Sequence, residues 1–576
     1  MHYFLKTTFL LAMPLAISAQ NMLPVKWKFK TGNDSLWAKS DFDDSQWAEI
    51  ETSQHWEKAG YENYDGYAWY RVKVNIPAKL KSEALKYGGL TLNLGKIDDA
   101  NATYFNGQLL GKTGDFPPNF INRYDDIRQY KIPADKVLWG KENTIAVCVY
   151  DHGGNGGMYS GDPELKVMGA ADNIKFTVAF DSKDQIFRKG NNADFSFAIK
   201  NSLDDKIGGK ISVTVKSDFG DSIGTLFREF KLEKQGQAIL DFEFDKLKPG
   251  FYNAAAQLIS ENGNKKLKFS FGVEPEKIHS PTDFQPDFDS FWEAAKKELA
   301  TVKPDYKIQL IDSLSKGNKN VYVVEMRSLG NVRVKGWYSV PKKEGKFPAI
   351  LHVQGYSSFL RLEGRASDED FIAFGLNIRG HGFSKDDVNP GFPGYLQYGI
   401  EDKNKYVYRG AYMDCRRALD FLFSRPEVDT TKVAVEGGSQ GGALSMATAA
   451  LNPERIKLCL PHVPFLSDFP DYFKIAFWPG NEFKEYMAKN PVAKWDDVYR
   501  TLSYFDIKNL APKVKCPTLM AIGLIDEVCP PHINFAAYNQ LNVPKEYIVY
   551  PTSGHGLPAE YHTYKYKWIK KQWGMK

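Results

Sequence analysis

Hydrophobic and polar residues alternate in short runs near the start of the chain. This period of two covers residues 69–76 and 144–150, and it is typical of strands that bury one face. Asn106-Gly107 lies between two apolar runs and is a strong signal for a β-hairpin. Many short strands joined by such turns predict an all-β domain over residues 24–170, a sandwich or jelly roll.

The same alternation continues in a second region, residues 172–274. It is clearest at residues 193–200, 209–216 and 254–260, and a Pro249-Gly250 turn precedes a further strand. This arrangement is common in immunoglobulin-like β-sandwiches. Because the region contains no constellation of chemically active residues, we expect it to act as a spacer.

The pattern changes from about Ser280, where apolar strands alternate with amphipathic helices. The predicted strands are residues 347–353, 371–378, 432–435 and 518–522, and the predicted helices are residues 409–424 and 441–451. Such alternation predicts a mostly parallel sheet covered by helices on both faces, over residues 280–576. The chain is therefore predicted to be multidomain, with two β-domains before an α/β domain of the α/β-hydrolase type.

Composition excludes several classes of partner. The net charge of +5 is spread over 576 residues, without the concentrated basic stripe that nucleic acid requires. No segment after the first twenty residues is apolar for long enough to span a bilayer, so membrane insertion is not expected. The five cysteines show no CxxC spacing, which gives no indication of a zinc site or disulfide framework. One bridge, such as Cys516 to Cys529, stays open.

The first residues resemble a secretory signal. Lys6 precedes an apolar stretch at residues 9–17, and Ser18 and Ala19 offer a small-residue cleavage site. We expect residues 1–19 to be removed and the protein to be exported, either to the periplasm or outside the cell. The alternative, a membrane anchor, would need more apolar residues than are present.

The candidate nucleophile is Ser439, at the centre of a G-x-S-x-G motif. A predicted strand precedes the motif and a predicted helix follows it. Gly437 and Gly441 flank the serine and let the strand and the helix approach closely, so that the hydroxyl projects from a sharp turn. The alternative is a glycine-rich loop with an exposed serine.

A serine hydroxyl needs a base, and the base needs an acid to orient it. In this fold the chain order is serine, acid, histidine, with each residue after a later strand. Asp526 follows the strand at residues 518–522, and His555 follows an apolar run at residues 547–550. The weaker rivals are Glu527, Asp506 and His562.

Two backbone N–H groups are predicted to hold the oxyanion. One belongs to Gln440, directly after the nucleophile, and the other to Tyr356, in the loop after residues 347–353. The Tyr356 ring would then form a wall of a small acyl pocket. The alternative for this ring is an ordinary place in the core.

The N-terminal region resembles the galactose-binding-like jelly rolls that accompany many glycoside hydrolases and some sialic-acid esterases. The stretches that match are residues 42–47, 66–71 and 94–107. The resemblance is specific for fold and weak for function. The tryptophans of the region offer either a surface for sugar stacking or core packing; they are Trp37, Trp47, Trp56 and Trp69.

The C-terminal region resembles the acetyl xylan esterase and cephalosporin C deacetylase family. The matching stretches are Phe284 through Trp292, Gly355-Tyr356, Arg379-Gly380-His381-Gly382, residues 408–414, residues 437–442, residues 523–526 and Cys529-Pro530-Pro531. The resemblance implies hydrolysis of acetyl esters on sugars with no metal and no organic cofactor. It implies Ser439, Asp526 and His555 as the triad, with Gln440 and Tyr356 at the oxyanion hole.

The chain departs from this family pattern at two positions. The family usually carries glutamine after Arg-Gly, where this chain has His381, and glutamate after the catalytic histidine, where it has Gly556. Neither departure removes a triad member, so the resemblance still implies esterase chemistry, but both leave the substrate open, as do the two added β-domains. Arg379 and His381 are therefore either substrate-binding or structural.

The function predicted from sequence is an exported serine esterase that deacetylates a carbohydrate. A peptidase of the prolyl-oligopeptidase type shares the hydrolase core, but we find no repeated blade-like segments for its propeller. A non-catalytic carbohydrate-binding protein would not need the complete triad order, and a glycosidase would need paired carboxylates on another scaffold. Family members often form hexameric rings, which the added β-domains could block, so the oligomeric state stays open.

Overall fold

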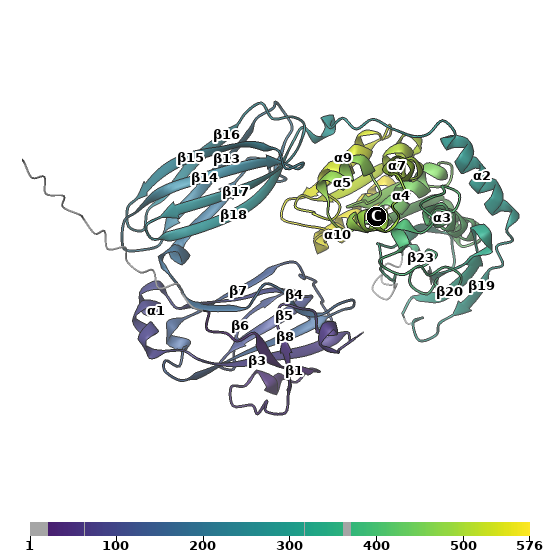
Figure 1. Cartoon of the computed structure of the whole chain (residues 1–576). Coiled ribbons are helices and arrows are strands. Elements are labelled where there is room, and N and C mark those ends of the chain that lie inside the picture. Colours follow the sequence, from purple (N-terminus) through teal and green to yellow (C-terminus); the bar gives the residue numbers. More distant parts are fainter. Residues whose placement is uncertain (1–20, 63, 316, 361–369, 576) are drawn as a thin grey trace, which may run out of the picture.

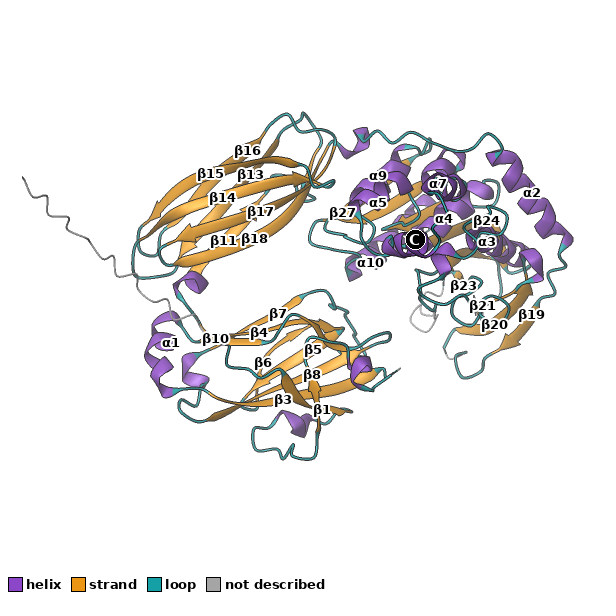
Figure 2. Cartoon of the chain, viewed as in Figure 1, coloured by secondary structure: helices purple, strands orange, loops and turns teal. Residues whose placement is uncertain are grey.

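The architecture comes from a computed structural model that describes residues 21–62, 64–315, 317–360 and 370–575. Three bodies follow one another along the chain (Figure 1). The first two consist mainly of strands, and the third contains nearly all of the helices (Figure 2). The predicted signal segment, residues 1–19, lies outside the described residues.

The N-terminal β-domain is built from two sheets that share one core. The first sheet has the order β2-β1-β3-β8-β5-β6, and in the second β4 pairs with β10, β7 and β9. The elements are β1 (Lys26–Thr31), β2 (Ala48–Glu51), β3 (Gly66–Asn75), α1 (Lys81–Tyr87), β4 (Leu90–Asp98), β5 (Ala100–Phe105), β6 (Gln108–Thr113), β7 (Ile127–Ile132), β8 (Glu142–Asp151), β9 (Gly157–Ser160) and β10 (Glu164–Val167).

Local features of this domain agree with the sequence. The predicted hairpin at Asn106-Gly107 is confirmed, because β5 and β6 pair antiparallel and both turn residues have positive φ. The tryptophans, by contrast, do not offer a stacking face. At most 8% of each is exposed, since all of them pack in the core; they are Trp37, Trp47, Trp56 and Trp69. The alternative that these rings stack on sugar is wrong.

The middle β-domain also consists of two sheets, with orders β11-β13-β16 and β12-β18-β17-β14-β15. Its strands are β11 (Ile174–Ala179), β12 (Ile186–Phe187), β13 (Ala193–Asn201), β14 (Ile207–Ser217), β15 (Ser222–Leu232), β16 (Gln237–Phe244), β17 (Gly250–Ser260) and β18 (Gly263–Val273). Phenylalanine rings from both sheets meet in the core, for example Phe195 and Phe269, with ring centroids 5.1 Å apart. Alternate inward side chains thus produce the sandwich that the period of two predicts.

The C-terminal hydrolase domain contains a nine-stranded sheet of order β19-β20-β21-β23-β22-β24-β25-β26-β27. In this order, β23, β22, β24, β25, β26 and β27 run parallel to one another. They are β19 (Lys307–Leu310), β20 (Lys319–Arg327), β21 (Arg333–Pro341), β22 (Phe347–Val353), β23 (Ile372–Asn377), β24 (Val428–Gly438), β25 (Leu458–His462), β26 (Thr518–Gly523) and β27 (Lys545–Tyr550).

Helices cover both faces of this sheet (Figure 2). They are α2 (Phe288–Thr301), α3 (Val407–Phe423), α4 (Gln440–Leu451), α5 (Phe469–Ile475), α6 (Asn481–Lys489), α7 (Trp495–Leu502), α8 (Ile507–Leu510), α9 (Pro531–Asn539) and α10 (Ala559–Gln572). The four predicted strands and two predicted helices are confirmed within one or two residues, except that β24 extends well beyond residues 432–435. Every residue of β22, β23 and β26 is buried, as expected for a sheet covered on both sides.

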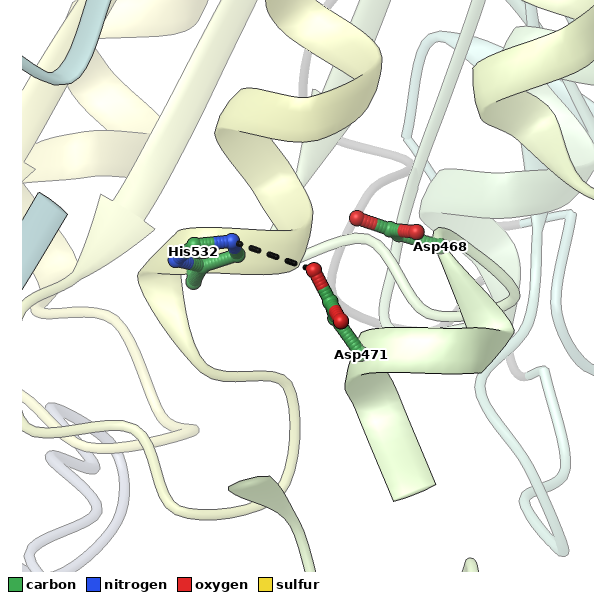
Figure 3. Close-up of side chains that lie close together, drawn as sticks. All are labelled: Asp468, Asp471 and His532. Carbon is green, nitrogen blue, oxygen red and sulfur yellow. Dashed lines mark ion pairs between the residues drawn. The ribbon is translucent and has the colours of Figure 1, made fainter. Parts of the chain in front are cut away.

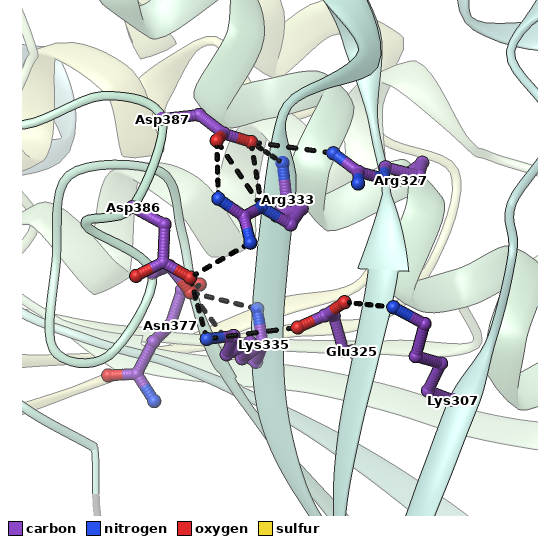
Figure 4. A network of polar contacts seen from close by, with 9 residues as sticks. Lys307, Glu325, Arg327, Arg333, Lys335, Asn377, Asp386 and Asp387 are labelled. Carbon is purple, nitrogen blue, oxygen red and sulfur yellow. Dashed lines mark hydrogen bonds and ion pairs between the residues drawn. The ribbon is translucent and has the colours of Figure 1, made fainter.

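Charged residues cover the antiparallel end of the sheet (Figure 4). Lys307 pairs with Glu325 at 3.0 Å, and Arg333 pairs with Asp387 at 2.8 Å. The edge strand β19 is exposed along its whole length. Charges beside an exposed edge oppose pairing with another chain, so this network protects the edge from aggregation.

Two further expectations concern bridges and membrane spans. All five cysteines are free and buried, so the open alternative of a Cys516–Cys529 bridge is wrong. Among the described residues, no helix combines the length and apolar character needed to cross a bilayer.

Candidate active site

Ser439 occupies a sharp turn between β24 and α4. Its backbone has φ 58° and ψ −124°, in a region that non-glycine residues rarely adopt. A β-carbon on Gly441 would lie 2.3 Å from the carbonyl oxygen of Val353, and one on Gly437 would lie 2.5 Å from the same oxygen. Both flanking glycines are therefore required, because β22 passes directly behind the turn.

His555 and Asp526 form a hydrogen-bonded pair. His555 Nδ1 lies 2.8 Å from Asp526 Oδ2. The other carboxylate oxygen, Oδ1, accepts the backbone N–H groups of Val528 and Cys529 at 2.8 and 2.9 Å. The Asp526 side chain is fully buried, whereas 23% of the His555 side chain is exposed. The acid is thus fixed in place, and the imidazole remains accessible to a substrate.

The serine lies close to this pair. Ser439 Oγ is 4.0 Å from the Sγ atom of Cys529, whose own N–H binds Asp526. In the described part of the chain, no hydrogen bond joins Ser439 to His555; such bonds often tighten only when substrate binds. Ser439 follows β24, Asp526 follows β26 and His555 follows β27, so the three residues lie at the carboxyl ends of parallel strands of one sheet.

Tyr356 follows the end of β22, and its ring is largely buried. Its hydroxyl donates to the carboxylate of Glu482, with distances of 2.9 and 2.8 Å to the two oxygens. The ring also contacts Phe392 and Trp478, with centroids 4.9 and 6.1 Å away. Burial and the Glu482 carboxylate raise the pKa of the Tyr356 hydroxyl well above its usual range. The predicted oxyanion residue is thus held by its own side chain.

Gln440 begins α4, and its side chain is buried among polar partners. Its Oε1 accepts the hydroxyl of Tyr408 at 2.6 Å, and its Nε2 lies 3.1 Å from His381 Nε2. His381 is fully buried, and this burial lowers its pKa to about 3. A neutral His381 can therefore accept a hydrogen bond from the Gln440 amide. The structure thus places His381 against the side chain of Gln440, the predicted oxyanion residue.

Arg379 is also buried. Its guanidinium donates to both carboxylate oxygens of Asp414, with distances of 2.9 and 2.7 Å, and to the carbonyl oxygen of Leu329 at 3.0 Å. Gly410 on α3 leaves space for it, since a β-carbon there would lie 2.1 Å from Arg379 Nη1. Of the two interpretations that the sequence left open, these contacts favour the structural one.

The rival residues lie in other environments. Asp506 caps α8 and accepts the N–H of Lys508 at 2.8 Å, so its carboxylate holds together a local turn. Glu527 and His562 are both exposed. None of the three rivals pairs with His555 or Ser439 among the described contacts.

Sequence reasoning missed two exposed aromatic residues, Phe477 and Trp478, near Tyr356. Phe477 is 72% exposed and Trp478 is 45% exposed, which is unusual for such large rings. It also missed Glu482, which accepts the Tyr356 hydroxyl. The only local signal was Phe477-Trp478 directly before Pro479-Gly480, outside any periodic segment.

A second cluster of titratable residues lies near α5 and α9 (Figure 3). Asp468, Asp471 and His532 come within ligand distance of one another. Each already has a partner, however. Asp468 pairs with Lys508 at 3.0 Å, Asp471 pairs with Lys474 at 2.7 Å, and His532 binds Asp218 at 2.8 Å. These pairs satisfy the charges, so the cluster gives no reason to expect a metal ion.

A mostly parallel sheet with helices on both faces, and a serine in a strand–helix turn at its carboxyl edge, define an α/β-hydrolase. The comparisons with known proteins identify the family. The family model described as Acetyl xylan esterase (AXE1) matches residues 274–572. The chain belongs to this family and is a serine carboxylic-ester hydrolase.

Individual proteins show how far the similarity extends. The acetyl esterase Axe7A of Xylanibacter ruminicola is 30% identical over 356 residues, which cover 59% of this chain and 78% of that protein. The acetyl xylan esterase from Paenibacillus sp. R4 is 36% identical, with a TM-score of 0.49; the match covers 51% of this chain and 98% of that one. Acylamino-acid-releasing enzyme 1 from Oryza sativa is 28% identical over 38% of this chain and 26% of its own length.

Proposed function

We propose that this protein is an exported carbohydrate esterase that removes acetyl groups from acetylated sugars through a triad of Ser439, Asp526 and His555. The observation that carries the proposal is the Ser439 turn, next to the loop on which Asp526 holds His555 at 2.8 Å. The family and the acetyl esterase relative supply the substrate class. Export rests on the sequence of residues 1–19 alone.

The reaction begins with proton transfer from the serine. Because His555 Nδ1 is bonded to Asp526, its Nε2 is the atom left to accept the proton from Ser439 Oγ. The oxygen then attacks the acetyl carbonyl, and a tetrahedral intermediate forms. His555 returns the proton to the sugar oxygen as the ester bond breaks. Water, activated by the same imidazole, then releases acetate and regenerates Ser439.

The negative charge of the intermediate needs fixed donors. We propose the backbone N–H groups of Gln440 and Tyr356, at the start of α4 and after β22. The contacts of Tyr356 with Glu482 and Trp478 hold this donor in position, and we expect the Tyr356 ring to border the acyl group.

The experiment that tests the function is acetate release from acetylated xylo-oligosaccharides. Ser439→Ala removes the nucleophile, and we expect kcat/KM to fall by about 10⁴-fold or more. Ser222→Ala is the matched control, because this exposed serine lies at the start of β15 in the middle β-domain. No release by the parent protein would contradict the assigned substrate, and full activity in Ser439→Ala would contradict the triad.

The partial match to acylamino-acid-releasing enzymes favours a second candidate, hydrolysis of N-acylated peptides. The β-domains argue against a peptidase of the prolyl-oligopeptidase type, because their strands form stacked sheets and not the radial blades of a propeller. If the protein hydrolysed an N-acetylated aminoacyl anilide faster than an acetylated sugar, the peptidase function would be favoured over the carbohydrate esterase function.

We also propose the identities of the three domains. Residues 24–170 are proposed as a galactose-binding-like jelly roll and residues 172–274 as an immunoglobulin-like sandwich. Residues 280–576 are proposed as the esterase domain. The two-sheet cores of the first two regions support these boundaries.

A further inference from the structure

A loop of the N-terminal β-domain lies against the segment that carries His555. The loop consists of residues 122–126, just before β7, and we call it the rim loop. A β-carbon on Gly556 would lie 3.3 Å from Tyr124 Cε1, and one on Gly554 would lie 3.1 Å from Asp125 Oδ2. The rim loop therefore touches both neighbours of His555, although it belongs to a different domain (Figure 1).

Hydrogen bonds within the N-terminal β-domain hold the backbone of the rim loop in place. The carbonyl oxygen of Tyr124 accepts the hydroxyl of Tyr159 at 3.1 Å and Arg128 Nη1 at 3.3 Å. Arg128 is fully buried and also donates to the carbonyl oxygen of Asp99 at 2.9 Å. The N–H of Tyr124 donates to Asn122 Oδ1 at 2.8 Å. These bonds hold the backbone of the loop in place, so ordering the loop costs little when a ligand binds.

The rim loop lies beside the segment of His555, the residue that is proposed to protonate the leaving group. In the proposed reaction His555 donates a proton to the departing sugar oxygen, so the sugar must lie beside the imidazole. The proposed oxyanion donors, Gln440 and Tyr356, hold the acyl oxygen from other loops of the domain. A side chain that contacts Gly556 is therefore on the sugar side of the site.

The chemistry of Tyr124 suits a sugar. Its side chain is half-buried, which leaves part of the ring available. Burial, with further effects from the Asp125 and Asp526 carboxylates, raises the pKa of Tyr124 to about 12, so the phenol stays neutral. A neutral aromatic ring with a hydroxyl can stack on the apolar face of a sugar and hydrogen-bond its edge.

We propose that Tyr124 of the N-terminal β-domain contacts the sugar part of the substrate and determines specificity in the esterase site. This assignment rests on the proposed function. It also accounts for one departure from the family pattern. Where the family usually carries glutamate, Gly556 leaves the space that the Tyr124 ring borders. The N-terminal domain then acts in substrate binding through its rim loop, and not through its buried tryptophans.

The test compares two substrates in the full-length protein. One is acetylated xylotriose, and the other is ethyl acetate, whose leaving group is too small to need the rim loop. For Tyr124→Ala we expect kcat/KM to fall about 10-fold on the saccharide, the effect of one lost aromatic contact. On ethyl acetate we expect kcat/KM to stay within about twofold of the parent value. Tyr87→Ala, at the end of α1, is the matched control and is expected to change neither activity.

The possible outcomes separate this assignment from the proposed function. If the parent releases acetate from the saccharide and Tyr124→Ala does so equally well, the assignment is wrong and the function stands. If Tyr124→Ala loses the same factor on both substrates, the residue supports the triad or the fold, which also contradicts the assignment. If the parent hydrolyses ethyl acetate alone, the sugar function fails, and the assignment fails with it.

Discussion

At the scale of the residue, His381 shows how a departure from the family pattern is accommodated. It stands where the family usually carries glutamine, and its Nε2 lies 3.1 Å from Gln440 Nε2, from which it can accept a hydrogen bond. Its Nδ1 lies 3.4 Å from the carbonyl oxygen of Arg379, to which it would donate weakly. These roles require the neutral imidazole, which burial favours.

We therefore predict that His381→Gln retains kcat within about threefold, because the new amide oxygen can accept from Gln440. His381→Leu removes the acceptor, and we expect kcat to fall about 10-fold with little change in KM. Steady-state kinetics on an acetylated oligosaccharide measures both values. A larger loss in His381→Gln than in His381→Leu would contradict the positioning role.

The same residue gives a prediction for pH. The pKa of His381 is lowered from 6.5 to about 3 in the folded protein. Between these values the unfolded state binds a proton that the folded state does not, so the parent loses stability as pH falls from 6.5 towards 3. We expect His381→Gln to gain stability relative to the parent at pH 4.5 but not at pH 8. Urea unfolding at both pH values measures the difference, and an equal effect at both would contradict it.

At the scale of the element, the strand–turn–helix around Ser439 depends on close backbone contact. Gly441 is in the first turn of α4, where alanine would ordinarily be favoured over glycine by about 1 kcal/mol. Here a β-carbon would lie 2.3 Å from the carbonyl oxygen of Val353, which is backbone and cannot rotate away. The steric conflict therefore outweighs helix propensity.

We predict that Gly441→Ala lowers the free energy of unfolding by about 1–3 kcal/mol and reduces activity, since β22 or α4 must shift. Gly224→Ala in β15 is the control, because a β-carbon there meets nothing within 4 Å. Denaturant unfolding and acetate release measure the two effects. Stabilisation by Gly441→Ala would show that helix propensity prevails and that β22 does not restrict the space at this position.

At the scale of the whole molecule, the middle β-domain packs on the hydrolase domain around α9. Phe251 of β17 contacts Phe535 of α9, with ring centroids 5.5 Å apart. His532 of the same helix binds Asp218, in the turn between β14 and β15, at 2.8 Å. This contact helps to position the middle β-domain relative to the hydrolase domain.

His532 makes this contact sensitive to pH. Burial opposes its charge, but Asp218, Asp471 and Asp468 together raise its pKa above the usual 6.5. The stabilisation that protonated His532 gives to the folded protein is fully present below pH 6.5, and it is lost as pH rises through the raised pKa of His532. The lysines that pair with Asp471 and Asp468 moderate the effect without removing it.

We predict that His532→Gln lowers the free energy of unfolding by about 1–2 kcal/mol at pH 6 and by less at pH 9. The exposed His279 provides the control, as His279→Gln, which should have no such dependence. Calorimetry at the two pH values measures the shift in the midpoint temperature of thermal unfolding. A loss in His532→Gln that is larger at pH 9 would contradict the charged contact.

The sequence alone determined most of the architecture and the chain order of the candidate triad. Periodicity identified β22, β23, β26 and the helices α3 and α4, because local alternation reflects which face of an element is buried. The Ser439 turn was predictable for a similar reason, since its flanking glycines are required within five consecutive residues. The pairing of His555 with Asp526 also follows the order expected for the fold.

Only the tertiary structure decided which residues surround these elements. It placed the tryptophans of the N-terminal domain in the core and His381 against Gln440, and it left Trp478 exposed beside Tyr356. It also placed Tyr124 beside Gly556. Such contacts join segments far apart in the chain, and their geometry depends on how sheets, helices and domains pack. Sequence pattern encodes the burial of each position, but it does not encode which distant side chain fills the space next to it.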